Sequence, residues 1–189
     1  MMKIKDIKKI FRLENGAVDC EVLFFGMEEY LPYTASPEDM DETGQRIWKE
    51  LQSGKWGEIS PFTVTPELIA AAKDAKKWEI EAWRTKQEAQ PFTFEWNGRT
   101  WNAGPDSMAR LYPAVMASKS DTARKTMVWS DAENQQVKLS MPELEELAAA
   151  MAQAQVDRND EIYRRQREMK EELSSLVDLR SIREMTISN

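Results

Sequence analysis

The chain has 189 residues, of which 41% are hydrophobic and 31% are charged, and its formal net charge is −7 at pH 7. This length and composition predict one medium domain or two small ones and exclude a disordered chain. Because histidine is absent, His-based catalytic triads are excluded, and zinc would have to rely on carboxylates and the single thiol of Cys20. A lone cysteine cannot form an internal disulfide, which is typical of a cytosolic protein.

The distribution of charged and apolar residues limits where the protein is expected to act and what it is expected to bind. No apolar run approaches the roughly 18 residues of a membrane helix, and the N-terminus lacks the apolar stretch of a secretory signal peptide. We therefore expect no membrane partner, and the negative net charge predicts no nucleic-acid partner. Basic side chains crowd residues 3–12, where they favour either an edge strand protected by lysines or a docking strip for an acidic partner.

The N-terminal part predicts a small β unit. Residues 3–13 alternate imperfectly as a strand, Asn15-Gly16 predicts a turn, and residues 18–24 place valine, cysteine and phenylalanine on one strand face. An extended stretch over residues 31–37 then leads to a short helix. These patterns predict an N-terminal β-rich domain over residues 1–62.

Residues 63–90 predict a connecting helix. Thr65 suits the N-cap, Pro66 suits the first helical position, and Pro91 stops the helix. Apolar side chains recur at three- and four-residue steps, which predicts a close packing seam between helices. The seam comprises Leu68, Ala71, Ala75, Trp78 and Ala82, and it is widened by Ile69, Ala72, Ile80 and Trp83.

Residues 92–101, FTFEWNGRTW, predict a β-hairpin. Aromatic and polar residues alternate, and Asn97-Gly98 is typical of a two-residue type I′ turn. Such a turn places Phe94 opposite Trp101, on the face that also holds Trp96. We interpret this face as buried, with an exposed aromatic binding platform as the alternative.

The C-terminal part predicts further short elements. A helix that contains Pro113 is followed by a polar loop over residues 118–125 and by two strands over residues 126–129 and 136–139. A capping box that begins at Ser140 then opens a long helix.

No proline or glycine interrupts the chain from residue 143 to residue 189. A helix of that length cannot bury itself fully against a small domain. Either it folds back near residues 157–160 or 178–181, or its far half contacts another chain.

Together these elements predict the α+β fold class. The predicted organisation is a small N-terminal β-hairpin plus helix unit over residues 1–62, a connecting helix over residues 63–90, and a C-terminal unit over residues 91–189. In that last unit, antiparallel hairpins pack on helices and a long helix ends the chain.

The sequence lacks the motifs of common enzymes. It has no Gly-rich phosphate loop, the adjacent carboxylates of Glu28-Glu29 point apart, and Asp39 with its acidic neighbours lacks EF-hand spacing. Cys20 alternates with apolar residues and is interpreted as a core residue rather than a nucleophile. We therefore predict no enzyme, no catalytic residue, no cofactor and no metal, with a carboxylate-pair hydrolase as the minor alternative.

The C-terminal half resembles a domain of unknown function that is common in tailed-bacteriophage proteins. The resemblance rests on the aromatic hairpin and on three further stretches, Ser107–Leu111, Trp129–Asn134 and Ser140–Gln153. Two positions depart from the family pattern: Gly104 stands where Asp is frequent, and Pro113 stands where a small residue is expected.

The first 60 residues resemble the N-terminal part of phage tail fibre assembly proteins, on the stretches Tyr33–Asp39, Gly44 and Gly54–Ile59. The resemblance implies a chaperone that binds the distal part of a phage tail fibre protein and promotes its folding and trimerisation by non-covalent binding. It also implies action in the host cytoplasm during infection. The alternative is a structural component of the virion tail, such as a tail adaptor or a fibre-associated cap.

Aromatic and helical apolar residues are the expected partner contacts. Tryptophan is a frequent anchor at interfaces, and the long C-terminal helix is expected to form a homo-oligomer or to grip the partner. The candidate partner-binding residues are Trp48, Trp56, Trp96, Trp101, Trp129, Ile162, Met169, Leu173 and Leu176.

Overall fold

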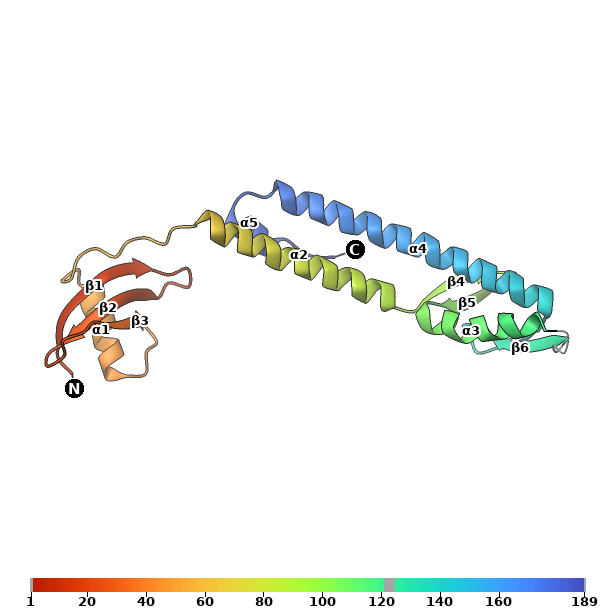
Figure 1. Cartoon of the computed structure of the whole chain (residues 1–189), viewed down its shortest axis with the longest axis horizontal. Helices are drawn as coiled ribbons and strands as arrows, with labels where there is room; N and C mark the ends of the chain where they lie inside the picture. The colour runs from red at the N-terminus through yellow and green to blue at the C-terminus, as the bar shows by residue number, and fades with distance from the viewer. Residues whose placement is uncertain (1, 121–124, 189) are drawn as a thin grey trace. The chain divides into compact units, whose positions relative to one another are not determined.

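The computed structural model describes residues 2–120 and 125–188. The chain divides into two compact units, Met1–Thr65 and Pro66–Asn189 (Figure 1). Within the described residues, the first unit combines a three-stranded sheet with one helix, and the second combines two hairpins with four helices. The predicted α+β fold class is confirmed.

The first unit is an antiparallel sheet in the order β1-β2-β3, packed on α1. The extended stretch that we expected after the hairpin is a third strand, because it pairs with β2 along its whole length. Side chains of β2 and of α1 form the core of this unit, together with isoleucines of β1. The elements are β1 (Ile4–Arg12), β2 (Val18–Phe24), β3 (Leu31–Ala35) and α1 (Glu42–Gln52).

The imperfect alternation of β1 has a structural cause. Its pairing with β2 shifts register between Ile4 and Asp6 and again between Lys8 and Phe11, and Lys9 adopts a φ of 52°. Each bulge adds one residue and so exchanges the two faces of the strand. The buried isoleucines of β1 therefore recur every three residues, at positions 4, 7 and 10.

The second unit contains all remaining elements. The expected hairpin is confirmed, with Phe94 opposite Trp101 and positive φ at both Asn97 and Gly98. The polar loop expected over residues 118–125 lies partly outside the described residues. The elements are α2 (Pro66–Ala89), β4 (Phe92–Trp96), β5 (Arg99–Ala103), α3 (Pro105–Ser118), β6 (Thr126–Ser130), β7 (Gln136–Ser140), α4 (Met141–Ser175) and α5 (Leu179–Glu184).

The long C-terminal helix folds back within its own unit. α4 continues without a break through residues 157–160, and the chain turns only after Ser175. Asp178 then caps α5, because its carboxylate accepts the N–H of Ser181 at 2.8 Å. The turn lies a few residues before the range 178–181 that we expected.

α2 packs against both α4 and α5 (Figure 1). The helix that we expected to be a separate connection over residues 63–90 therefore lies in the same compact unit as the C-terminal elements. None of the helices in the described part of the chain is long and apolar enough to cross a membrane.

The packed face of α2 differs from the main seam that we predicted. Ile80 is fully buried and Trp83 packs beside it, whereas Trp78 is 76% exposed. Three alanines of the predicted seam, Ala71, Ala75 and Ala82, are also exposed. Both stripes repeat at three- and four-residue steps, so spacing does not distinguish them. The stripe with the larger side chains is buried, because it removes more apolar area from water.

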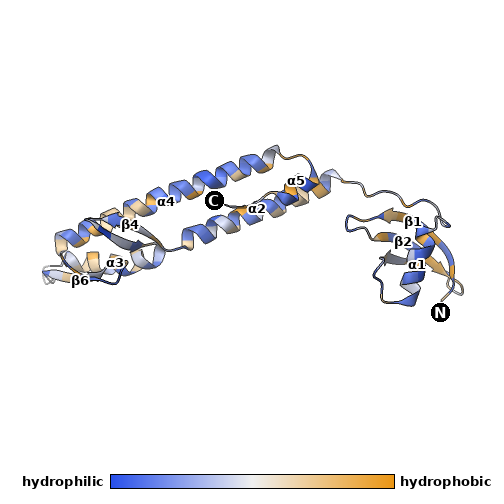
Figure 2. Cartoon of the chain, turned by 180° about the vertical axis from the view of Figure 1, so that it is seen from behind, coloured by the Kyte–Doolittle hydropathy of each residue, from blue (hydrophilic) through white to orange (hydrophobic). Residues whose placement is uncertain are grey.

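The second unit has two separate apolar clusters. We call the first the hairpin core, which gathers residues of β5, α3, β7 and the start of α4, namely Trp101, Ala103, Leu111, Leu139, Leu144, Leu147 and Met151. We call α2, α5 and the part of α4 from residue 155 onward the helical arm. Its own cluster, the arm core, comprises Ile80, Met169, Leu173, Ile182 and Met185. Figure 2 shows that most of α4 is hydrophilic along its length.

Candidate functional site

Two of the predicted tryptophan anchors lie in the first unit, and both are half-buried against its core. Trp48 and Trp56 pack on the apolar cluster formed by the sheet and α1. The indole N–H of Trp56 donates to Glu50 Oε2 at 2.7 Å, and Lys55 Nζ lies 4.6 Å from the centre of its ring. These contacts hold the loop after α1 in place, so Trp56 has a structural role.

The other three predicted tryptophans belong to the hairpin core. Trp101 is 1% exposed, and its indole N–H donates to the backbone oxygen of Trp96 at 3.0 Å. The two rings meet edge to face at 5.9 Å. Trp129 is half-buried against the same core. The buried interpretation of the aromatic hairpin face is therefore confirmed for Trp101, whose side chain is not on the surface.

The predicted helical contacts are core residues of the arm. Ile162, Met169 and Leu173 are buried, and Leu176 packs against the same arm core. The far half of α4 thus packs against α2 of its own chain and shares the arm core with Ile182 of α5. Ile162, Met169 and Leu173 therefore expose little surface, whereas Leu176 is half-buried.

The residues that carry the N-terminal resemblance form one packed cluster. The hydroxyl of Tyr33 donates to Asp39 Oδ2 at 2.6 Å, and burial, followed by this hydrogen bond, raises the pKa of Tyr33 to about 12. Gly44 is buried beside them, and a Cβ atom at this position would overlap both the Asp39 carboxylate and the Tyr33 hydroxyl. This part of the motif therefore specifies how α1 meets β3.

A polar pocket of about 400 Å³ opens in the second unit, and its lining comes from β5, α3, β6 and the loop after β6. Most of its residues lie in the stretches Ser107–Leu111 and Trp129–Asn134, which carry the resemblance of the C-terminal half. The two stretches are separate in the chain, so the sequence indicates their polar residues but not that they meet. Its lining residues are Asn102, Ser107, Arg110, Val128, Trp129, Ser130, Asp131 and Asn134.

Asp131 organises the wall of this pocket. Its Oδ1 accepts the backbone N–H of Glu133 at 3.0 Å and of Gln135 at 2.8 Å, and Arg99 donates to its Oδ2 at 2.9 Å. Burial by itself would raise the pKa of the Asp131 carboxyl, but the N–H donors and Arg99 outweigh it and lower that pKa. The carboxylate is thus an anchor for the β6–β7 loop.

Gly104 positions the opposite wall. It adopts a φ of 110° at the N-cap of α3, and a Cβ atom there would lie 3.1 Å from the Cα of Pro91. The departure from the family pattern at this position thus has a steric reason, because glycine permits this backbone conformation. The helix start that follows carries Ser107, which is 6% exposed, into the pocket wall.

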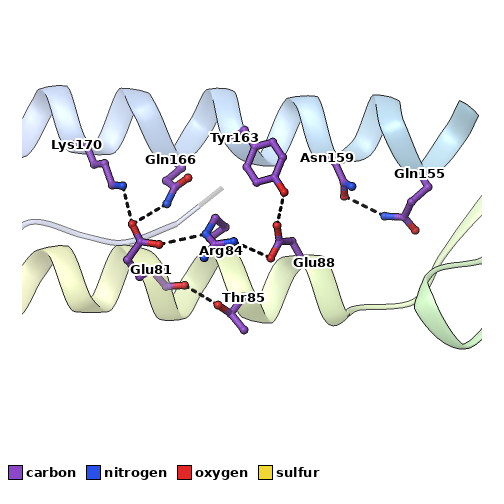
Figure 3. Close-up of polar contacts among 9 residues, drawn as sticks. All are labelled: Glu81, Arg84, Thr85, Glu88, Gln155, Asn159, Tyr163, Gln166 and Lys170. Carbon is purple, nitrogen blue, oxygen red and sulfur yellow. Dashed lines mark hydrogen bonds and ion pairs between the residues drawn. The ribbon is translucent and has the colours of Figure 1, made fainter.

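The middle of the helical arm is joined by polar side chains (Figure 3). Glu81 of α2 accepts a hydrogen bond from Gln166 at 2.9 Å and pairs with Lys170 at 2.6 Å. The hydroxyl of Tyr163 donates to Glu88 Oε1 at 2.6 Å. The hydrogen bond from Lys170 is the largest influence on the Glu81 carboxyl and helps to lower its pKa.

Two buried polar atoms lie at this helix pair without a hydrogen-bond partner among the described residues: Gln155 Oε1 and Arg158 Nε. The Arg158 guanidinium also lies 5.1 Å from the Phe92 ring centre, which places it where the arm meets the hairpin core. Unsatisfied buried polar atoms weaken a packed interface. The arm is therefore less tightly joined at this point than at its arm core.

Two candidate groups of the sequence, the Cys20 thiol and the acidic side chains, can be placed in the described residues. Burial, followed by the charge of Asp19, raises the pKa of the Cys20 thiol to about 11, so the nucleophilic thiolate is disfavoured. In residues 2–120 and 125–188, no three His, Cys, Asp or Glu side chains gather in a group that could hold a metal ion.

Comparison with known proteins identifies one region of the chain. Residues 71–185 match the model of a domain of unknown function, DUF4376. The match begins inside α2, in agreement with the place of this helix in the second unit. No curated protein matches the chain, and no solved structure does so. Because the match spans more than half of the 189 residues, the chain belongs to the DUF4376 family.

Proposed function

We propose that this protein is an assembly chaperone for a phage tail fibre, which binds the distal part of the fibre protein and promotes its folding and trimerisation without covalent chemistry. The proposal rests on the resemblance of the first 60 residues to tail fibre assembly proteins. It also rests on the surface that the first unit presents to its surroundings.

The observation that carries the proposal is the group of apolar side chains exposed around the sheet of the first unit. Phe25 is 65% exposed at the end of β2, and Leu31 is 40% exposed at the start of β3. Met27, in the connection between β2 and β3, is also exposed, and Phe11 is exposed on β1 opposite Asp19. Exposed apolar side chains that lie close together, as around this connection, are typical of a surface that binds another protein.

The open face of the same sheet adds a groove of about 370 Å³. Its lining comes from all three strands, and the order β1-β2-β3 leaves β3 at one edge of the sheet. Its floor carries the ion pair of Lys9 with Glu21, at 2.6 Å, and the hydroxyl of Thr34 donates to Asp19 at 2.5 Å. An edge strand with a groove beside it can accept an extended segment of a partner.

The physical need for such a partner comes from fibre folding. Trimeric β-rich fibre tips are dominated by contacts between residues distant in sequence, so they fold slowly. During that time they expose unpaired strand edges and apolar patches, which promote aggregation. A folded protein that covers these surfaces transiently would favour trimerisation over aggregation.

Co-expression tests the proposal directly. The tail fibre protein is produced alone, with the wild-type chain, and with the double variant Phe25→Ser/Leu31→Ser, and the fraction of soluble, SDS-resistant fibre trimer is measured. We expect the wild-type chain to raise this fraction several-fold and the variant to lose most of the gain. The matched control is Val177→Ser, which changes an 82% exposed side chain in the second unit and should retain the gain.

Equal yields of trimer with and without the chain would contradict the proposal. Mass spectrometry of purified particles addresses the alternative of a structural virion component. Copies of this chain in stoichiometric ratio to the fibre would favour that alternative over a transient chaperone.

A further inference from the structure

We propose that the polar pocket of the second unit binds a carboxylate group, with Arg110 as its charged anchor. The carboxylate is that of an acidic polypeptide segment or of a small free acid. The pocket lies outside the first unit, so this proposal does not depend on the surface assigned to fibre binding.

The lining of the pocket is rich in hydrogen-bond donors. Asn102 and Asn134 contribute side-chain amides, Ser107 and Ser130 contribute hydroxyls, and Arg110 contributes a guanidinium. Each of these groups donates hydrogen bonds, and a carboxylate accepts several at once. A volume of about 400 Å³ lies within the usual range of small-ligand sites.

Asp131 is the carboxylate of the pocket lining, and it already has hydrogen-bond and ion-pair partners within the protein. Asp131 accepts two backbone N–H groups and pairs with Arg99 at 2.9 Å. It therefore does not neutralise Arg110, and its lowered pKa keeps it ionised and fixed in the wall. Asn134 follows in the same loop, with a φ of 59°, and lines the pocket.

Arg110 itself makes only a weak contact in the described part of the chain. Its Nη2 donates to Ser107 Oγ at 3.4 Å, which is long for a hydrogen bond from a charged donor. By contrast, Arg84 and Arg99 each pair with a carboxylate within 3.2 Å. In an acidic chain, a guanidinium beside an open pocket and without such a pair is suited to an external anion.

The charge balance selects the class of anion. Arg110 supplies one positive charge, and the exposed Asp106 lies in the first turn of the same helix. A phosphate dianion brings two negative charges to a single guanidinium and is repelled more strongly by Asp106. A monoanionic carboxylate matches the single guanidinium and can bind it in bidentate geometry. The half-buried indole of Trp129 gives the apolar carbons of such a ligand a surface to contact.

Amide chemical shifts of the full-length protein test the proposal. The probes are the peptides Ac-Ala-Glu-Ala-NH2, with a side-chain carboxylate, and Ac-Ala-Gln-Ala-NH2, its neutral isostere, together with sodium acetate and inorganic phosphate. We expect the Glu peptide to shift the amides of Asn102, Ser130 and Asn134 with saturation in the millimolar range. The Gln peptide should leave them unchanged.

Two variants separate binding from folding. Arg110→Gln should weaken the response to the Glu peptide at least tenfold, while the indole N–H signal of Trp101 stays in place as a marker of the intact hairpin core. The matched control, Arg180→Gln, removes an exposed arginine of α5 and should bind like the wild type.

The source of the carboxylate follows from the same titrations. Acetate binding as tightly as the Glu peptide assigns the pocket to small acids, and clearly tighter binding of the peptide assigns it to a polypeptide. Equal binding of the Gln and Glu peptides overturns the proposal, as does undiminished binding by Arg110→Gln. A response to phosphate alone overturns it as well.

Discussion

The hairpin core buries apolar side chains around Trp101, whereas the middle of the helical arm is joined by hydrogen bonds and ion pairs between α2 and α4. Both belong to the same unit, and α4 runs through both. Apolar burial contributes to stability in proportion to the area removed from water, while exposed and half-exposed ion pairs contribute little. We infer that the hairpin core is the stable part and that the arm opens first.

The largest effect is expected at Trp101. Trp101→Ala removes a side chain that is 1% exposed, together with its hydrogen bond to Trp96, and should lower the free energy of unfolding by about 3–5 kcal/mol. Urea denaturation followed by far-UV circular dichroism measures this change. The matched control is Trp78→Ala at a 76% exposed position, for which we expect less than about 0.5 kcal/mol. Equal effects of the two substitutions would contradict the assigned burial.

The second-largest loss of stability is expected from a substitution in the arm core. Leu173→Ala opens a cavity at a side chain that is 2% exposed and should destabilise the arm by about 2–3 kcal/mol. Hydrogen exchange should speed up in α5 and in the facing turns of α2 while β4 and β5 stay protected. Val177→Ala, at an 82% exposed position, is the control.

The same variant separates an internal core from a contact between chains. Because Leu173 packs on its own chain, the elution volume in size exclusion should be the same for wild type and Leu173→Ala. A shift to smaller assemblies would instead show that this stripe joins two copies.

The sequence was informative wherever local chemistry determines the structure. Asn97-Gly98 permits positive φ and so predicts both the turn and the pairing of Phe94 with Trp101. Ser140 likewise predicts the start of α4, since its side chain accepts the N–H of Glu143 at 3.3 Å. Such signals require only neighbouring residues.

Features that depend on distant parts of the chain were not predictable in the same way. Two stripes of α2 have equivalent spacing, and only the docking of α4 and α5 decides that Ile80 is buried and Trp78 is exposed. The pocket beside Arg110 likewise forms only when α3 and the β6–β7 loop meet. Tertiary contacts of this kind leave no periodic pattern.

A smaller effect is expected from the ion pairs of the arm. The pKa of Glu81 is lowered in the folded state, with Lys170 as the first cause. Its contribution is therefore present above the unfolded-state pKa of about 4.3 and is lost as the pH falls through the lower folded-state value. Glu81→Gln should reduce the Tm at neutral pH and low salt, and the difference from wild type should shrink in high salt and in acid.

The matched control for Glu81 lies on the same helix. Glu79 pairs with Lys76 within α2, at 2.8 Å, whereas Glu81 reaches across to α4. Glu79→Gln should therefore change the Tm less than Glu81→Gln does. If both variants behave alike, the polar contacts between the helices do not hold the arm together.

The smallest expected effect is a gain in the free energy of unfolding, whereas the preceding substitutions reduce stability. Gln155→Met removes the buried Oε1 that has no hydrogen-bond partner in the described structure, and it also removes the bond from Nε2 to Asn159 Oδ1 at 3.0 Å. Because Asn159 is half-buried and can bond to water instead, we expect a stabilisation of up to about 1 kcal/mol.

The matched control is Gln153→Met, which breaks an equivalent bond to Asp157 at 2.8 Å on the exposed side of α4. Urea denaturation should show a gain for the first variant and none for the second. A loss of stability with Gln155→Met would mean that water satisfies this buried oxygen and that the arm is as well joined where it meets the hairpin core as at its arm core.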